Sequence, residues 1–132
     1  MVIQPNKEPE LKFVAWYSII VGALMLGQWG FFLASGQVPE LQAEPYRIAF
    51  HLVGEGVTAI ALIVSGIALL RRISWSQQAA FASLGMLTYT VLVSPGYFAQ
   101  LGQWPLVAMF AVLLVLTLMS FFLLGRGMNP DR

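Results

Sequence analysis

The chain has 132 residues, of which 58% are hydrophobic and only 10% are charged, with a mean hydropathy of +0.76 and a formal net charge of +1. A soluble domain carries about 25% charged residues, and a small one has too much surface to cover it with apolar side chains. The composition therefore excludes an ordinary soluble domain and argues against a nucleic-acid partner, and the absence of cysteine excludes disulfides and thiolate metal sites.

Four apolar runs are long enough to cross a hydrocarbon core of about 30 Å, which requires about 20 helical residues. They cover about residues 13–35, 47–70, 78–98 and 105–125. Lipid satisfies no free backbone groups, so a chain this short and continuously apolar is predicted to span as helices. The connections are short, which makes consecutive helices antiparallel neighbours. We therefore predict an all-α integral membrane protein, an antiparallel four-transmembrane-helix bundle that forms a single domain over residues 1–132.

The first run contains one strongly polar residue, Gln28, in the half that approaches the next loop. Ala34, Ser35 and Gly36 resemble a signal-peptidase site. However, the preceding apolar run is longer than the hydrophobic region of a usual signal peptide. We expect this segment to remain as a helix.

The second run carries a ladder of three polar residues, Arg47, His51 and Glu55, each one helical turn from the next. An ionised carboxylate at the bilayer centre costs roughly 2.5 to 3.5 kcal/mol on insertion scales, so it needs a partner or a purpose. At 1.5 Å per residue, His51 lies about 6 Å and Glu55 about 12 Å deeper than Arg47. The ladder is predicted to lead from external water toward the midplane of the membrane.

A helical wheel divides the second run into two sides. The side predicted to face the bundle holds Arg47, His51, Gly54, Glu55, Thr58, Ala61 and Ser65. The side predicted to face lipid holds Val53, Val57, Ile60, Ile63, Val64 and Ile67.

The third run places polar residues on one side, and the fourth run is predicted to serve packing. The polar residues of the third run are Ser83, Thr90, Ser94 and Tyr97, and Pro95 is expected to kink the helix there. Polar side chains thus gather in the outer half of the first three helices, where we predict a cavity open to the outside. The predicted ligand- or proton-binding residues are Glu55, His51, Arg47, Gln28, Ser94 and Tyr97.

The basic residues predict the orientation in the membrane. Those expected on one side are Lys7, Lys12, Arg71, Arg72, Arg126 and Arg132, whereas Arg47 alone falls on the other. By the positive-inside rule, both termini are predicted to be cytoplasmic. We expect a multi-pass protein of the inner or plasma membrane.

Three functions remain open from the sequence. The first is the binding or transport of a small ligand or a proton at Glu55 and His51, in which case four helices would usually require a dimer. The second is an enzyme acting on a lipid-soluble substrate, because an acid and an imidazole can act as general acid and base. In chemistry only, the pair resembles the His/Glu pairs of intramembrane isomerases.

The third is an accessory subunit that binds another membrane protein, in which the pair would be a structural hydrogen bond. We expect no cofactor and no metal site.

Overall fold

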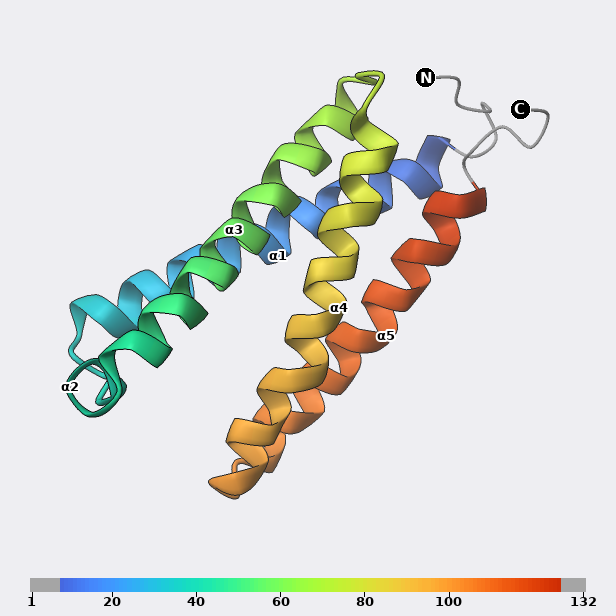
Figure 1. The fold of residues 1–132 in the computed structure, drawn as a ribbon. Helices are drawn as coiled ribbons and strands as arrows, with labels where there is room; N and C mark the ends of the chain where they lie inside the picture. Colours follow the sequence, from blue (N-terminus) through green and yellow to red (C-terminus); the bar gives the residue numbers. More distant parts are fainter. Residues whose placement is uncertain (1–7, 127–132) are drawn as a thin grey trace.

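The computed structural model describes residues 8–126, and the regular elements of this part of the chain are all helical (Figure 1). They are α1 (Glu8–Ala34), α2 (Glu40–Ala43), α3 (Pro45–Leu70), α4 (Ser76–Gln100) and α5 (Trp104–Arg126). The four long helices are apolar and long enough to cross a membrane, which confirms the predicted all-α architecture. Two residues used to predict the orientation, Lys7 and Arg132, lie outside the described residues.

The helices extend beyond the apolar runs that predicted them. Helix α1 begins at Glu8, before the predicted start at residue 13, because a helix continues through polar residues that hydropathy does not count. Helix α3 begins at Pro45, where the missing N–H of proline costs nothing, since the first amides of a helix have no intrahelical partner. The short α2 lies in a segment that the sequence analysis treated as a loop. Helix α4 continues through Pro95 to Gln100.

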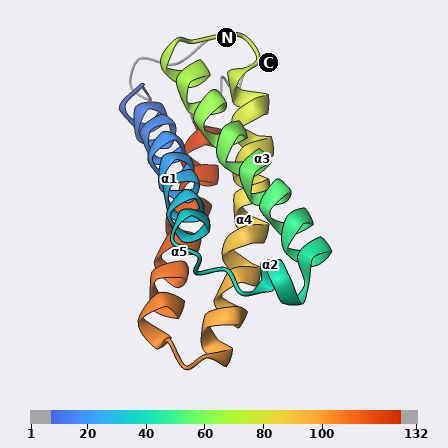
Figure 2. The same cartoon turned by 90° about the vertical axis from the view of Figure 1, so that its left-hand side faces the viewer.

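The bundle consists of two antiparallel hairpins. Helix α1 packs mainly against α3, and α4 packs mainly against α5, while the contact between α3 and α4 joins the two hairpins. The hairpins meet at the end that carries residues 71–75 and diverge toward the end that carries α2 and residues 101–103 (Figures 1 and 2). The start of α1 and the end of α5 lie at the joined end, where Glu10 and Arg126 approach to 3.7 Å.

Two glycines bring the backbones of α1 and α3 into direct contact. A Cβ atom added to Gly22 of α1 would lie 2.6 Å from the carbonyl oxygen of Ala59. A Cβ atom added to Gly66 of α3 would lie 2.6 Å from the carbonyl oxygen of Ala15. The contact is thus reciprocal, as small residues allow between helices in membranes. Gly54, which was predicted to face the bundle, is instead exposed and has open space around it.

The predicted lipid-facing side of α3 is exposed except at one position. The exposed residues are Val53, Val57, Ile60, Val64 and Ile67. Ile63 is half-buried, because its side chain lies against Gly22 of α1, 2.8 Å from the point that a Cβ there would occupy. The absence of a side chain at Gly22 leaves the space that Ile63 fills.

Hydrogen bonds between side chains tie the helices together inside the bundle. The Tyr17 hydroxyl of α1 lies 2.8 Å from Oγ1 of Thr117 and 3.1 Å from the carbonyl oxygen of Leu113, both on α5. Ser65 of α3 and Ser83 of α4 lie 2.9 Å apart, oxygen to oxygen. These contacts fix which faces of the helices meet, because each hydroxyl finds its partner in only one rotational setting.

Three long helices end in the same backbone arrangement. Gly36 after α1 and Gly102 after α4 both have φ of +72°, which glycine adopts without steric cost. After α3 the corresponding position is Arg72, with φ of +55°, a conformation uncommon for residues other than glycine. The guanidinium of Arg72 pairs with Glu8 of α1. The turn that joins the two hairpins is therefore anchored to the start of α1.

Candidate functional site

Glu55 is the acidic residue that the fold places inside the bundle. Its relative exposure is 9%, whereas the side chain of His51, one turn earlier on α3, is 46% exposed. The His51 Nε2 and Glu55 Oε1 atoms are 3.8 Å apart, which is longer than an ordinary hydrogen bond. The predicted His51–Glu55 pair is present, but the imidazole only partly compensates the carboxylate.

Helices α1 and α4 supply the other neighbours of this pair. The Thr90 side chain of α4 lies near the Glu55 carboxyl group. Trp29 of α1 lies edge-on to His51, with ring centroids 5.6 Å apart and an interplanar angle of 72°. Three helices therefore converge on the acid.

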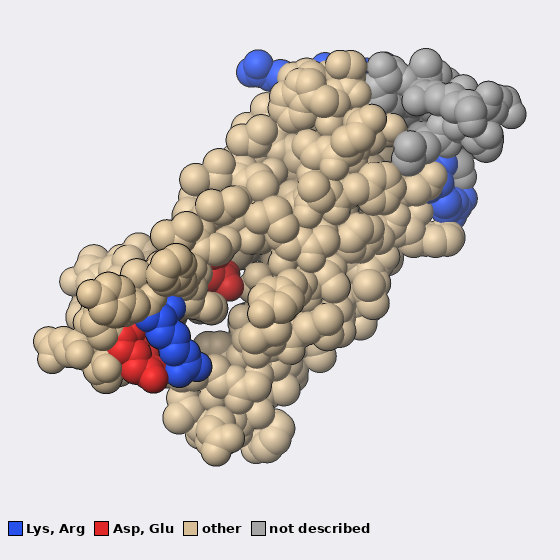
Figure 3. All heavy atoms as spheres, in the orientation of Figure 1, with Lys and Arg blue, Asp and Glu red and all other residues tan. Residues whose placement is uncertain are grey.

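A cavity of about 220 Å³ lies beside Glu55, between α1 and α3. Its walls are formed by Met25, Leu26, Trp29, Gly30, Leu33, Leu52, Glu55 and Gly56. Glu55 is the only ionisable residue among them, so the cavity is an apolar space with one carboxyl group on its wall. Figure 3 shows a hollow between the two diverging hairpins, with acidic atoms at its inner end.

Four of the predicted site residues do not line the cavity beside Glu55, and two of these four bind acidic residues elsewhere. Nη1 of Arg47 donates to Oε2 of Glu44 at 3.0 Å, and both side chains are exposed. The Tyr97 hydroxyl donates to Oε1 of Glu40 in α2 at 3.4 Å. Gln28 is exposed and Ser94 is half-buried, and neither lines the cavity beside Glu55. Of the six predicted residues, the structure brings together Glu55 and His51.

Arg47 and Tyr97 instead hold the loop that contains α2. Arg47 lies in the first turn of α3, where its long side chain reaches back to Glu44 just before the helix. Tyr97, near the end of α4, bridges the two hairpins through Glu40. Both side chains therefore contact acidic residues of this loop, Glu44 and Glu40.

Trp29 and Thr90 were not among the predicted site residues, although the spacing of residues along α1 and α4 indicates both. Ala15, Gly22 and Trp29 recur every seven residues along α1, so the face that packs on α3 also carries Trp29. Thr90 lies seven residues after Ser83, which bonds to α3. Gln28 is the more polar residue, but it is exposed and lies off the face of α1 that packs on α3.

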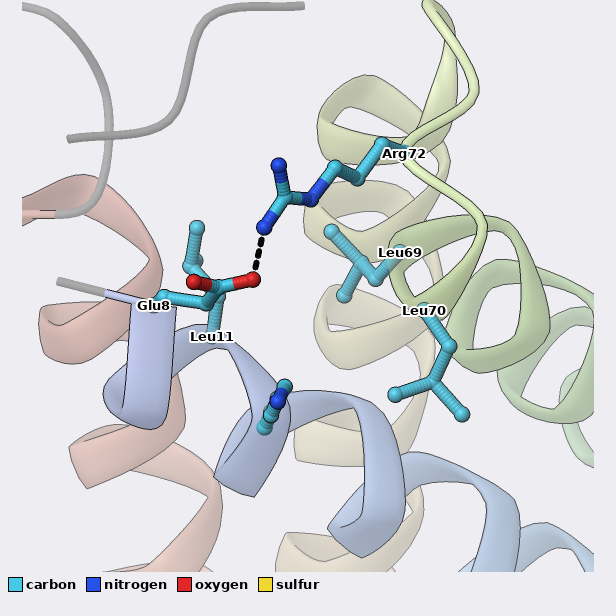
Figure 4. A pocket seen from close by; sticks show the side chains of 6 residues that line it. Glu8, Leu11, Leu69, Leu70 and Arg72 are labelled. Carbon is cyan, nitrogen blue, oxygen red and sulfur yellow. Dashed lines mark ion pairs between the residues drawn. The ribbon is translucent and has the colours of Figure 1, made fainter. Parts of the chain in front are cut away.

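A second, much smaller cavity of about 20 Å³ lies at the joined end of the hairpins. Figure 4 shows Glu8 and Arg72 directed toward one another there, with Leu11, Leu69 and Leu70 beside them. This volume holds about one water molecule. The ion pair therefore closes that end of the bundle and leaves no room for a ligand.

The described residues contain no group of three or more His, Cys, Asp and Glu side chains that could hold a metal ion. The chemistry available near the cavity is therefore that of one carboxyl group, one imidazole, one hydroxyl and one indole.

The model of one protein family, described as "Domain of unknown function (DUF8058)", matches residues 9–127. The match covers all four long helices and the site between them. No curated protein and no solved structure matches the chain.

Proposed function

The chain belongs to the DUF8058 family, and we propose that it is a multi-pass membrane protein that binds or transports a small ligand or a proton at Glu55. The observation that carries the proposal is a buried carboxyl group on the wall of an otherwise apolar cavity. Acidic residues within membrane spans are costly, and they mark ligand or proton sites by default. A glutamine would supply a hydrogen bond at the same place without this cost.

The proposed membrane is the inner or plasma membrane, with both termini in the cytoplasm. Arg71, Arg72 and Arg126 lie at the joined end of the hairpins, and Arg47 lies at the diverging end. This asymmetry supports placing the joined end in the cytoplasm. The cavity beside Glu55 then lies in the outer half of the membrane, as a site open to the outside requires.

The proximity of His51 to Glu55 keeps an intramembrane enzyme as a second candidate. An imidazole and a carboxyl group 3.8 Å apart, next to an apolar cavity, can act as acid and base on a lipid-soluble substrate. Loss of substrate turnover with retained binding in His51→Gln would favour this candidate over transport.

The test is thermal unfolding of the purified protein and of Glu55→Gln in mild detergent, from about pH 5 to 8. We expect the variant to unfold at the same temperature as the wild type or higher, because a buried charge without a full partner destabilises the fold. We also expect the unfolding temperature of the variant to depend less on pH than that of the wild type, because the variant lacks the titratable carboxyl group.

Tyr17→Phe is the matched control for this measurement. It removes one hydroxyl that bonds α1 to α5, and it should lower stability by about 0.6 kcal/mol, the average for interhelical hydrogen bonds in membranes, and by no more than about 1.7 kcal/mol. If Glu55→Gln behaves like this control or worse at every pH, the acid is structural and the proposed function fails.

A further inference from the structure

The charge on Glu55 has no full partner among the described residues. On α3, Arg47 is engaged by Glu44, and His51 is 3.8 Å away and half exposed. Helix α4 contains no charged residue, the charges of α1 lie in its first two turns, and the charge of α5 lies in its last turn, all at the joined end. A cation that entered the cavity would therefore meet a single, incompletely compensated carboxylate.

The walls of the cavity exclude a simple metal ion and favour an organic group. Divalent ions such as Ca²⁺ require about six to eight oxygen ligands, and the cavity lining offers one carboxylate among apolar side chains. Met25, Leu33 and Leu52 provide apolar surface, and Trp29 provides the aromatic ring that attracts cations most strongly.

The volume limits the size of such a ligand. The cavity measures about 220 Å³. It is larger than a cavity of about 150 Å³ that holds benzene, and smaller than the roughly 300 Å³ at which drug-sized sites begin. The space thus fits one aromatic ring or one branched alkyl group together with a small ammonium group.

On the basis of the proposed function, we propose that this cavity binds a small hydrophobic organic cation, with Glu55 as its counter-ion and Trp29 against its apolar body. The carboxylate supplies the charge partner, and the side chains of α1 and α3 replace water around the rest of the ligand. No covalent step is involved.

The test is the affinity of the purified protein for benzyltrimethylammonium, measured by isothermal titration calorimetry in mild detergent. The comparison ligands are neopentylbenzene, which has the same shape without charge, and benzoate, which carries the opposite charge. We expect the cation to bind with a Kd at least about tenfold lower than either comparison ligand.

Two pairs of variants identify the site. Glu55→Gln should weaken cation binding at least about tenfold, whereas Glu40→Gln, at an acid outside the cavity, should change the Kd by less than about twofold. Gly56→Leu places a side chain in the cavity and should abolish binding. Gly54→Leu on the same helix should not, because Gly54 does not line the cavity. A Cβ at either glycine meets open space, so both variants should fold.

Several results would overturn the inference. They are equal affinity for the cation and the neutral isostere, full binding to Glu55→Gln or to Gly56→Leu, and no binding of the cation at millimolar concentration. If the cation does not bind but Glu55→Gln unfolds at the wild-type temperature or higher, only the identity of the ligand is wrong. If Glu55→Gln is destabilised as much as Tyr17→Phe or more at every pH, the proposed function fails as well.

Discussion

Two buried serines differ in whether their hydroxyl groups form hydrogen bonds, and this difference should determine how much each contributes to stability. Ser65 of α3 lies 2.9 Å from Ser83 of α4 and also donates to the carbonyl oxygen of Leu62. Ser18 of α1 is equally buried, but its hydroxyl has no hydrogen-bond partner among the described residues. The two positions have the same side chain and the same burial, and they differ in hydrogen bonding.

We expect Ser65→Ala to destabilise the protein by about 0.6 to 1.7 kcal/mol, because it breaks a hydrogen bond between helices. Ser18→Ala should be neutral or stabilising, because it removes a buried polar group that is unsatisfied. Reversible unfolding of both variants in detergent measures the two free energies. Equal losses at the two positions would contradict this account.

At the scale of helices, the contact between α1 and α3 depends on the lack of side chains at Gly22 and Gly66. The nearest atoms to an added Cβ at these positions are carbonyl oxygens of the other helix. Backbone atoms cannot rotate away as a flexible side chain can. A methyl group at either glycine must therefore push the two helices apart.

We expect Gly22→Ala and Gly66→Ala each to destabilise the protein by about 1 to 3 kcal/mol, the usual cost of overpacking. Gly85→Ala in α4 is the matched control, because a Cβ there meets nothing within 4 Å. It should stabilise the protein by up to about 1 kcal/mol through helix propensity. Thermal unfolding of the three variants tests the contact, and a stable Gly66→Ala would show that the helices are further apart.

For the whole molecule, the connections between the helices lie at two opposite ends of the bundle, and they can therefore report its orientation across a membrane. Helix α1 is followed by residues 35–39 and α4 by residues 101–103, both at the diverging end, while residues 71–75 lie at the joined end. If the bundle spans a membrane, these connections face opposite sides. The chain contains no cysteine, so single cysteines can report the side directly.

We expect a membrane-impermeant maleimide to label Gln37→Cys and Gln103→Cys from outside intact cells, because both positions are exposed at the diverging end. Ser74→Cys, which is exposed at the joined end, should be labelled only after the membrane is permeabilised. The reverse pattern would contradict the proposed cytoplasmic termini and would place the Glu55 cavity on the inner side.

The helices, their antiparallel order and the side of α3 that carries the acid could all be predicted from the sequence. Hydropathy identified all four long helices, because each long apolar run must form its backbone hydrogen bonds internally. Periodicity placed Glu55 inside and Val53 and Val57 outside, because successive residues of a helix turn by a fixed angle. These properties are local, so no knowledge of a neighbouring helix was needed.

The side chains that meet around that acid could not be predicted in this way, because they depend on how the helices pack. In the folded protein Trp29 and Thr90 lie beside the His51–Glu55 pair. Arg47 and Tyr97 instead donate hydrogen bonds to the acidic residues Glu44 and Glu40 of the loop. The rotation and depth of one helix against another depend on side-chain fit, here the space left by Gly22 and Gly66. Periodicity gives the face of a helix but not the residue opposite it, and so the cavity beside Glu55 emerged only from the packing of α1 on α3.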